Sequence, residues 1–360
     1  MLSDIKEEPE IIRKLIKEYI PENCPVQNIS IKKERISKIY IIASGSSRNV
    51  GNIARYFIEE VSKIPVCIEH ASEFGERNPV LSPGDVVIFV SQSGETSDVL
   101  QALKIAKAKG VYTFAVTNNP ESTIHKSADS AMFIHAGKEI SIPATKSFLA
   151  QLLCLYILGI YFAETDKSLP EYEISIYKQQ IYRMPEKIEK LISGTEEIDK
   201  VAEKLYQAKD LIVLGRGQNY GLAEEFALKI QETCYINSGG YPTGEFLHGH
   251  LAMLDNTTPV LSIITEAGGS DSNYNLAVNN TVKIIEKRNP PVFVLKNKSD
   301  KTVQEKLSGH KVEYLNISEF DRGFSPVYSA VVLHLLSYKM AKLLGHDVNH
   351  PRSLSKTVSE

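Results

Sequence analysis

The sequence predicts an α/β protein built from two tandem, doubly wound parallel-sheet domains. Two observations lead to this fold class. Short apolar segments alternate with segments of helical periodicity, and part of the first half of the chain is repeated in the second half. Alternating strands and helices favour a parallel sheet covered by helices on both faces. Right-handed crossovers then place the loops that follow the strands at one edge of each sheet, where open α/β sheets bind ligands.

The internal repeat aligns residues 39–74 with residues 211–246 without gaps. In both copies an apolar strand runs into a short turn, then a helix, a second short strand and a closing Glu-Phe pair. The turn is rich in serine in the first copy, at residues 44–47, and contains Arg216 and Gly217 in the second. The next strands also correspond, and each precedes a loop, at residues 91–96 and 266–270. We therefore expect two similar domains.

The chain divides into five predicted parts. These are an N-terminal helical segment (1–30, with a helix from Glu10 to Tyr19), a first domain (31–165), a helical linker (166–196), a second domain (197–344) and a C-terminal tail (345–360).

Composition excludes several classes of protein. The formal net charge of −3 argues against a nucleic-acid-binding face, which is usually basic. The four cysteines show no CxxC spacing, so we expect neither a zinc site nor disulfides, and no cofactor. A charged start, unlike a signal peptide, together with these free cysteines predicts a cytoplasmic protein. The apolar stretch 148–163 is shorter than the roughly 20 residues that a bilayer requires, so we interpret it as a core helix or subunit interface and expect no membrane association.

The segment Ser91-Gln92-Ser93-Gly94-Glu95-Thr96 is the most informative motif. It follows an apolar strand at 85–90 and precedes a helix at 98–107. The N–H groups of a first helical turn lack internal partners and favour anions, and the hydroxyl groups of the loop add donors. Because the loop contains no Lys or Arg, we expect a phosphate monoester held by neutral donors. The alternative is a helix cap without a ligand.

Charged residues mark one helix of the second copy. Glu225, Lys229 and Glu232 are spaced i, i+4 and i+7 and share one helix face, whereas the aligned first-copy residues are Ile53, Phe57 and Glu60. This asymmetry predicts that the first domain binds phosphate and the second supplies chemistry. A solvated ion pair between Glu225 and Lys229 is the alternative interpretation.

Together with the closing segment Asn349 to Glu360, these motifs resemble the isomerase half of the glucosamine-6-phosphate synthases, which is built from two SIS domains of flavodoxin- or Rossmann-like fold. The resemblance covers nearly the whole chain. It implies a sugar-phosphate ligand held by the phosphate-binding residues Ser47, Ser91, Gln92, Ser93 and Thr96. Gly45, Ile142 and Ala144 are expected to line the sugar.

The resemblance also implies catalytic roles. Glu232 matches the carboxylate that moves a proton between C1 and C2, with Glu225 and Lys229 beside it. His248 matches the ring-opening histidine, which the neighbouring subunit of a homodimer donates, and Lys356 matches the lysine that meets the open-chain carbonyl. These residue types suit the chemistry. Isomerisation needs a carboxylate base, and ring opening needs an acid–base group whose pKa is near neutrality. The open-chain carbonyl needs a nearby cation or an amine that can form an imine.

Alternatives remain for two of these residues. His248 and His250 could form a metal pair, but the sequence offers no third ligand at a suitable spacing. Lys356 could be a surface residue of a frayed tail.

The sequence departs from the family pattern at several positions. It contains no amidotransferase half, so we expect that it does not release ammonia from glutamine. It also contains no Trp. Ala144 replaces a serine near the sugar, Leu247 replaces a lysine and His250 a proline. Because these changes lie around the expected sugar site, the resemblance does not identify the substrate.

We expect an amino-sugar phosphate isomerase, with glucosamine-6-phosphate deaminase as the leading function. A fructosamine-6-phosphate deglycase and an aminotransferase without a glutaminase are alternative enzymes. A sugar-phosphate sensor is an alternative from another class; it would not need Glu232, His248 and Lys356 together.

Overall fold

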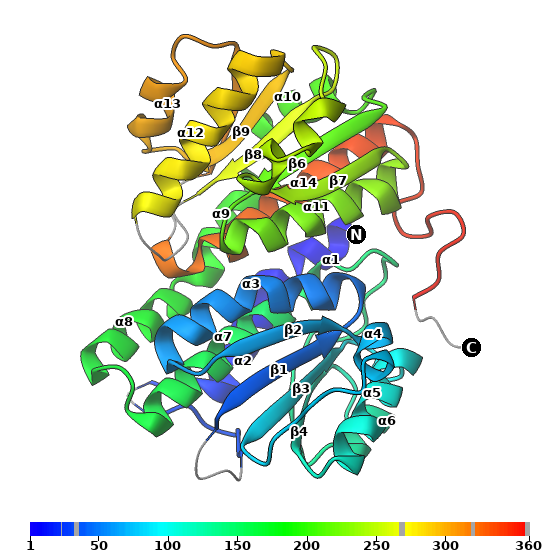
Figure 1. Ribbon diagram of the computed structural model, residues 1–360, viewed down its shortest axis with the longest axis vertical. Helices are drawn as coiled ribbons and strands as arrows, with labels where there is room; N and C mark the ends of the chain where they lie inside the picture. Colours follow the sequence, from blue (N-terminus) through cyan, green and yellow to red (C-terminus); the bar gives the residue numbers. More distant parts are fainter. Residues whose placement is uncertain (23, 32–35, 266–270, 318–320, 357–360) are drawn as a thin grey trace. The chain divides into compact units, whose positions relative to one another are not determined.

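The computed structural model describes residues 1–22, 24–31, 36–265, 271–317 and 321–356 (Figure 1). Its contacts divide the chain into two compact units. The first unit contains Glu7–Glu139, Lys146–Pro185 and the tail residues Ser355 and Lys356; the second contains Met1–Lys6, Ile140–Thr145 and Glu186–Leu354. Residues 1–30 and 166–196, predicted as a leading segment and a linker, are thus each shared between the two units.

The first unit is built on a five-stranded, all-parallel sheet with the order β2-β1-β3-β4-β5. Its strands are β1 (Lys38–Ala43), β2 (Val66–His70), β3 (Asp85–Ser91), β4 (Tyr112–Thr117) and β5 (Ser130–Phe133). Every residue of β3 is buried, as expected of a central strand covered on both faces.

Helices cover both faces of this sheet. The helices of the unit are α2 (Glu8–Tyr19), α3 (Gly45–Ser62), α4 (Ala71–Glu76), α5 (Ser97–Ala108), α6 (Thr123–Ser127), α7 (Lys146–Asp166) and α8 (Glu171–Tyr182). α4 and α5 enclose a core with Tyr40, Ile42, Val87 and Phe89 of the sheet, whereas α3 packs on β1 and β2 and against α7.

α7 is the long apolar helix predicted within 148–163. Among the described residues it is the one helix long and apolar enough to cross a membrane, and 83% of its most apolar window is buried in the protein. It packs against α2 and α3. Burial of this kind is what a core helix requires.

Tyr19, the last residue of α2, closes the outer edge of β5. Its hydroxyl donates to the carbonyl of Phe133 at 3.0 Å and accepts from the N–H of Phe133 at 2.9 Å. Both main-chain groups that Phe133 presents at the sheet edge are therefore paired.

The second unit repeats the strand order of the first, since its parallel sheet runs β10-β9-β8-β6-β7. Its strands are β6 (Asp210–Gly215), β7 (Asn237–Pro242), β8 (Val260–Ile264), β9 (Val292–Asn297) and β10 (Val312–Ile317). The prediction of two doubly wound parallel sheets is confirmed. The predicted loop at 266–270 lies outside the described residues.

The second sheet is also covered on both faces. α12 (Asp271–Arg288) and α13 (Lys301–Lys306) enclose a core with Ile212, Leu214 and Val260. The other helices of the unit are α1 (Leu2–Lys6), α10 (Glu196–Leu205), α11 (Gln218–Cys234), α14 (Ser325–Leu343) and the short 3₁₀ turns η1 (Glu245–Leu247), η2 (His250–Met253) and η3 (Arg322–Phe324). α11 packs on β6, β7 and α14 (Figure 1). α9 (Met184–Ser193) joins the units in sequence.

Candidate active site

Two loops meet at the carboxyl edge of the first sheet, where β1 and β3 are paired. β1 leads through Ser44 into α3, whose first turn carries Ser47, and β3 leads through residues 92–96 into α5. Because β2 lies on the outer side of β1 and β4 on the outer side of β3, the strand order reverses here. Open α/β sheets bind ligands at such a switch point. The structure therefore brings the predicted phosphate-binding residues to one edge.

Hydroxyl groups organise the loop after β3. The Oγ of buried Ser91 lies 2.9 Å from the Oγ1 of Thr96 and accepts the N–H of Gly94 at 3.1 Å. Ser93 Oγ accepts the N–H of Glu95 at 3.2 Å. The loop is also tied to the next strand, since Asn118 donates its N–H to the carbonyl of Gln92 at 3.1 Å. These hydrogen bonds restrict the conformation of the loop.

Gly94 cannot be replaced without strain. Its φ of +69° lies in the left-handed region, and a Cβ atom there would stand 2.4 Å from Ser122 Oγ and 2.5 Å from Ser122 Cβ. The tight fit arises because Ile124 donates its N–H to the Gly94 carbonyl at 3.1 Å.

Thr96 is the N-cap of α5, and its side chain makes no capping hydrogen bond to this helix end. The N–H groups of the first turn therefore face the loop without an internal partner. Together with the hydroxyls of Ser91, Ser93 and Thr96, they form an anion site made of neutral donors, which suits a phosphate group.

The three charged residues of α11 form one buried array. Lys229 is fully buried, and its Nζ lies 3.5 Å from Glu225 Oε1 and forms an ion pair with Glu232. Glu225 is 2% exposed, whereas Glu232 is 21% exposed. Behind them, His334 Nε2 of α14 lies 3.9 Å from Glu225 Oε1. The interpretation of Glu225 and Lys229 as a solvated pair is therefore wrong.

The corresponding helix of the first unit, α3, lacks the buried charges of α11. The aligned positions of α3 hold Ile53 and Phe57, both buried apolar side chains. Burying a lysine and a carboxylate instead carries a large desolvation penalty, which their mutual attraction offsets only with good geometry. The one partly exposed member of the array, Glu232, lines a cavity of about 490 Å³ together with Arg352, Ser353 and Leu354 of the tail.

The tail reaches this cavity through Tyr235, just beyond the end of α11. The Arg352 guanidinium lies 4.1 Å from the centre of the Tyr235 ring, and the Arg352 N–H donates to the Tyr235 hydroxyl at 2.9 Å. These contacts make Arg352 an anchor of the tail.

His248 lies at the other end of the second sheet from Glu232. Glu232 is near the end of α11, beside the start of β7, whereas His248 follows the end of β7. At about 3.3 Å per residue, a six-residue strand separates them by roughly 17 Å. His248 lines a different cavity of about 720 Å³, with Glu245, Leu247, Asn280, Lys283 and Lys287. The structure does not bring the two residues together within one chain.

Lys356 is held in the first unit by a residue that the sequence did not single out. Its Nζ lies 2.6 Å from Glu139 Oε2, and the Glu139 side chain is fully buried. Lys356 is therefore a paired residue rather than the tip of a frayed tail. No sequence pattern marks Glu139, which follows β5 in an irregular segment.

The predicted sugar-lining residues fall in different units. Gly45 begins α3 in the first unit with a φ of +54°. Ile142 and Ala144 are half-buried and belong to the second unit, where the N–H of Ile142 donates to the Asn349 carbonyl at 3.0 Å.

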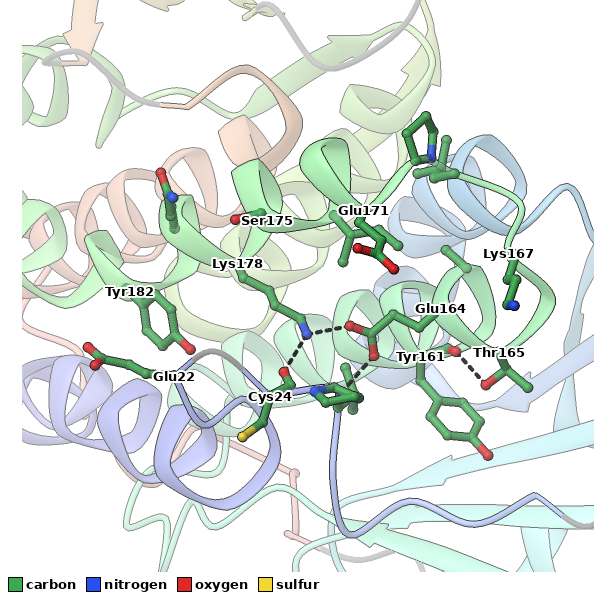
Figure 2. A pocket seen from close by; sticks show the side chains of 17 residues that line it. Glu22, Cys24, Tyr161, Glu164, Thr165, Lys167, Glu171, Ser175, Lys178 and Tyr182 are labelled. Carbon is green, nitrogen blue, oxygen red and sulfur yellow. Dashed lines mark hydrogen bonds and ion pairs between the residues drawn. The ribbon is translucent and has the colours of Figure 1, made fainter.

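A larger cavity, of about 1060 Å³, lies elsewhere in the first unit between the chain after α2, α7 and α8 (Figure 2). Lys178 crosses it, pairing with Glu164 and donating to the Cys24 carbonyl at 2.9 Å. None of the predicted site residues lines it. Across the described ranges, no group of three His, Cys, Asp or Glu side chains is placed to hold a metal ion.

Comparison with known proteins supports the resemblance. The SIS domain family model matches residues 31–161 and 204–343. The glutamine–fructose-6-phosphate aminotransferases [isomerizing] of Clostridium tetani and Clostridium acetobutylicum are 35% and 36% identical to this chain over all of its length. The chain spans 58% of the length of each relative.

Solved structures show the same fold. The C-terminal domain of glucosamine-fructose-6-phosphate aminotransferase from Francisella tularensis matches with a TM-score of 0.89 and 30% identity, covering 98% of this chain and 97% of that one. Glucosamine-6-phosphate deaminase from Thermotoga maritima matches with a TM-score of 0.72 and 23% identity over 99% and 98% of the two chains, which is evidence of fold alone. With both α/β units matched in sequence and in structure, the chain belongs to the SIS domain family and corresponds to the isomerase half of its aminotransferase relatives.

Proposed function

We propose that this protein is an amino-sugar phosphate isomerase that converts glucosamine 6-phosphate and water into fructose 6-phosphate and ammonia. The observation that carries the proposal is the buried Glu225–Lys229–Glu232 array, with Glu232 alone open to a cavity. A carboxylate with one supported oxygen and access to a ligand suits proton transfer at carbon.

Each step has a candidate residue. The loop Ser91 to Thr96, with Ser47, holds the phosphate. His248 opens the sugar ring, and Glu232 takes the proton from C2 and returns it to C1, which turns the 2-amino aldose into a 2-imino ketose. Water then adds at C2 and ammonia leaves, while Lys356 stabilises the negative charge that develops on oxygen or forms an imine with the ketose.

The aminotransferase relatives support the sugar-phosphate substrate, because they are named for fructose 6-phosphate. Deamination is the direction that we propose for this chain, since it needs no supply of ammonia.

We further propose a homodimer in which His248 acts on the substrate bound by the neighbouring subunit. Its separation from Glu232 by the full length of β7 supports this arrangement. A cytoplasmic location remains our prediction from the sequence.

The test is to incubate the purified protein with glucosamine 6-phosphate and to measure fructose 6-phosphate and ammonia together. We expect equal amounts of both products. Fructose 6-phosphate without ammonia, or no product despite saturable binding, would contradict the deaminase.

One observation favours a second candidate, a deglycase that splits fructosamine 6-phosphates into an amine and a sugar phosphate. Leu247, where the related synthases have a lysine, lines the 720 Å³ cavity beside His248, and Ala144 has a smaller side chain than serine. Both changes would leave room for a larger amine. Turnover of ε-fructoselysine 6-phosphate without turnover of glucosamine 6-phosphate would decide for the deglycase. An aminotransferase without a glutaminase would instead form glucosamine 6-phosphate from fructose 6-phosphate and added ammonia.

A further inference from the structure

Glu139 is a buried carboxylate with three well-placed donors. Its side chain is fully buried. Oε1 accepts the N–H of Ser147 at 3.1 Å, and Oε2 accepts the Ser147 hydroxyl and the Lys356 ammonium, each at 2.6 Å. All three residues belong to the first unit. A buried carboxylate is stable only when its oxygens are paired in this way.

The start of α7 fixes Glu139 independently of the tail. Ser147 is the second residue of α7, so its N–H is one of the unpaired donors of a helix N-terminus, where negative charge is favoured. Lys146, 1% exposed, donates to the Lys138 carbonyl at 2.8 Å and pairs with Glu7 at 2.6 Å. The backbone immediately before Glu139 is thus held in place.

The position of the Lys356 ammonium depends on a partner, because the lysine side chain can otherwise adopt many rotamers. It lies near the end of the chain, has four rotatable side-chain bonds, and keeps 31% of its side chain exposed. A lysine in that setting loses rotamer freedom when it acts at one point. The 2.6 Å contact with an immobile carboxylate restricts the position of its Nζ.

We propose that Glu139 is the positioning residue of Lys356, holding its ammonium where the open-chain carbonyl of the substrate is presented. This rests on the proposed function, which assigns Lys356 to the carbonyl. Glu139 itself does not touch the substrate in this arrangement. Its loss therefore lowers the rate of the chemical step and leaves the phosphate grip of Ser91 to Thr96 unchanged.

The first experiment needs no turnover. Lys356 is acylated with an isotope-coded anhydride at one fixed pH, and the time course of its labelling, here called its labelling profile, is quantified by mass spectrometry in wild type and in Glu139→Gln. In wild type the Lys356 Nζ is held 2.6 Å from a buried carboxylate, which limits its access to the reagent. We expect Lys356 to be labelled several-fold faster in Glu139→Gln, because its ammonium is no longer held there. A profile identical to wild type would overturn the proposal.

The matched control is Glu121→Gln, since Glu121 also pairs with a lysine, Lys126 at 3.1 Å, but its side chain is 80% exposed. It should leave the Lys356 profile unchanged. Ser147→Ala keeps the carboxylate and the ion pair while removing one hydroxyl, so its Lys356 profile should stay close to wild type. If Glu139→Gln does not fold, Ser147→Ala still tests the proposal. A Lys356 profile that changes in Ser147→Ala as much as is expected for Glu139→Gln would show that the ion pair does not control the labelling of Lys356, and would contradict the proposal.

The second experiment separates positioning from structure. On whichever sugar phosphate the protein turns over, Glu139→Gln should lower kcat roughly 10- to 100-fold with KM nearly unchanged. The double variant Glu139→Gln/Lys356→Gln should be no slower than Lys356→Gln alone, because Glu139 acts through Lys356. Additive losses, or a change confined to KM, would overturn the proposal. If wild type turns over no sugar phosphate, the proposed function fails, and the labelling profile still decides whether Glu139 holds Lys356.

Discussion

Glu232 is the residue on which the proposed chemistry depends, since it alone of the α11 array opens onto a cavity. Glu232→Gln keeps the shape of the side chain and removes the base. We expect turnover of glucosamine 6-phosphate to fall by about 10²- to 10⁴-fold, the usual contribution of a general base. Calorimetric binding of the sugar phosphate should change little, because the phosphate loop lies in the other unit.

The control is Glu203→Gln, an exposed carboxylate on α10 of the same unit, which should retain full turnover. Loss of binding in Glu232→Gln would contradict the division of labour between the two domains.

Gly94 allows a matched test of the phosphate loop. Gly94→Ala imposes a side chain at φ +69° and a clash with Ser122, whereas Gly110→Ala imposes one at φ +70° with no atom within 4 Å. Both variants should lose about 1–2 kcal/mol of unfolding free energy from the backbone strain. Only Gly94→Ala should weaken sugar-phosphate binding, by roughly tenfold or more. Equal effects on binding would show that the loop is not the phosphate site.

At the scale of an element, α11 combines stability and function. Lys229→Met removes the cation between Glu225 and Glu232 and leaves the buried Glu225 carboxylate without its lysine. We expect a loss of about 3–5 kcal/mol in urea unfolding. Glu225→Leu/Lys229→Met, which makes this face apolar as in α3, should recover much of that stability and none of the activity. A double variant no more stable than the single one would contradict this account.

The loop after β5 contributes a pH dependence. Burial lowers the pKa of His135 below its usual value, with Lys14 adding to and Glu18 opposing the effect. The folded state therefore binds fewer protons than the unfolded state, so the contribution of His135 is present above about pH 6.5 and is lost as the pH falls below it. Unfolding free energies measured from pH 7.5 to 5 should decline less in His135→Gln than in wild type. Parallel curves would contradict this assignment.

Elements were predictable from the sequence where periodicity marks them, as for β3, α7 and α11. Contacts were less so. The i, i+4, i+7 spacing placed Glu225, Lys229 and Glu232 on one face, but whether that face is buried depends on α14 and His334, which lie far along the chain. Glu139 was missed because it lies in an irregular segment and pairs with a residue 217 positions away. No local pattern encodes such a contact.

At the scale of the whole molecule, the proposed dimer has a sharp test by complementation. Glu232→Gln and His248→Asn should each be inactive alone. If each site takes Glu232 from one chain and His248 from the other, a heterodimer regains one intact site. A mixture unfolded and refolded together at equal concentrations should then reach about a quarter of wild-type turnover, since half of the random dimers are mixed.

Mixing without subunit exchange serves as the control and should give no activity. An inactive refolded mixture, together with a fully active wild-type monomer on dilution, would contradict the shared site.

The arrangement of the whole molecule was predictable from the sequence only in part. The repeat predicted two like sheets, and their identical strand orders follow from it. The repeat did not predict that Glu232 and His248, which are close in sequence, lie at opposite ends of the strands of one sheet. Their positions depend on the directions in which α11 and β7 run.

The hydroxyl of Tyr19 has a consequence for how this protein behaves when it is stressed. An uncovered outer strand is a template on which another chain can add a strand and start aggregation. One phenolic oxygen on α2 occupies both the N–H and the carbonyl of Phe133 at the end of β5. Detachment of the N-terminal helix would therefore do more than loosen the fold. It would expose a site for intermolecular β-pairing, so the solubility of the first domain is tied to the docking of a helix that precedes its first strand.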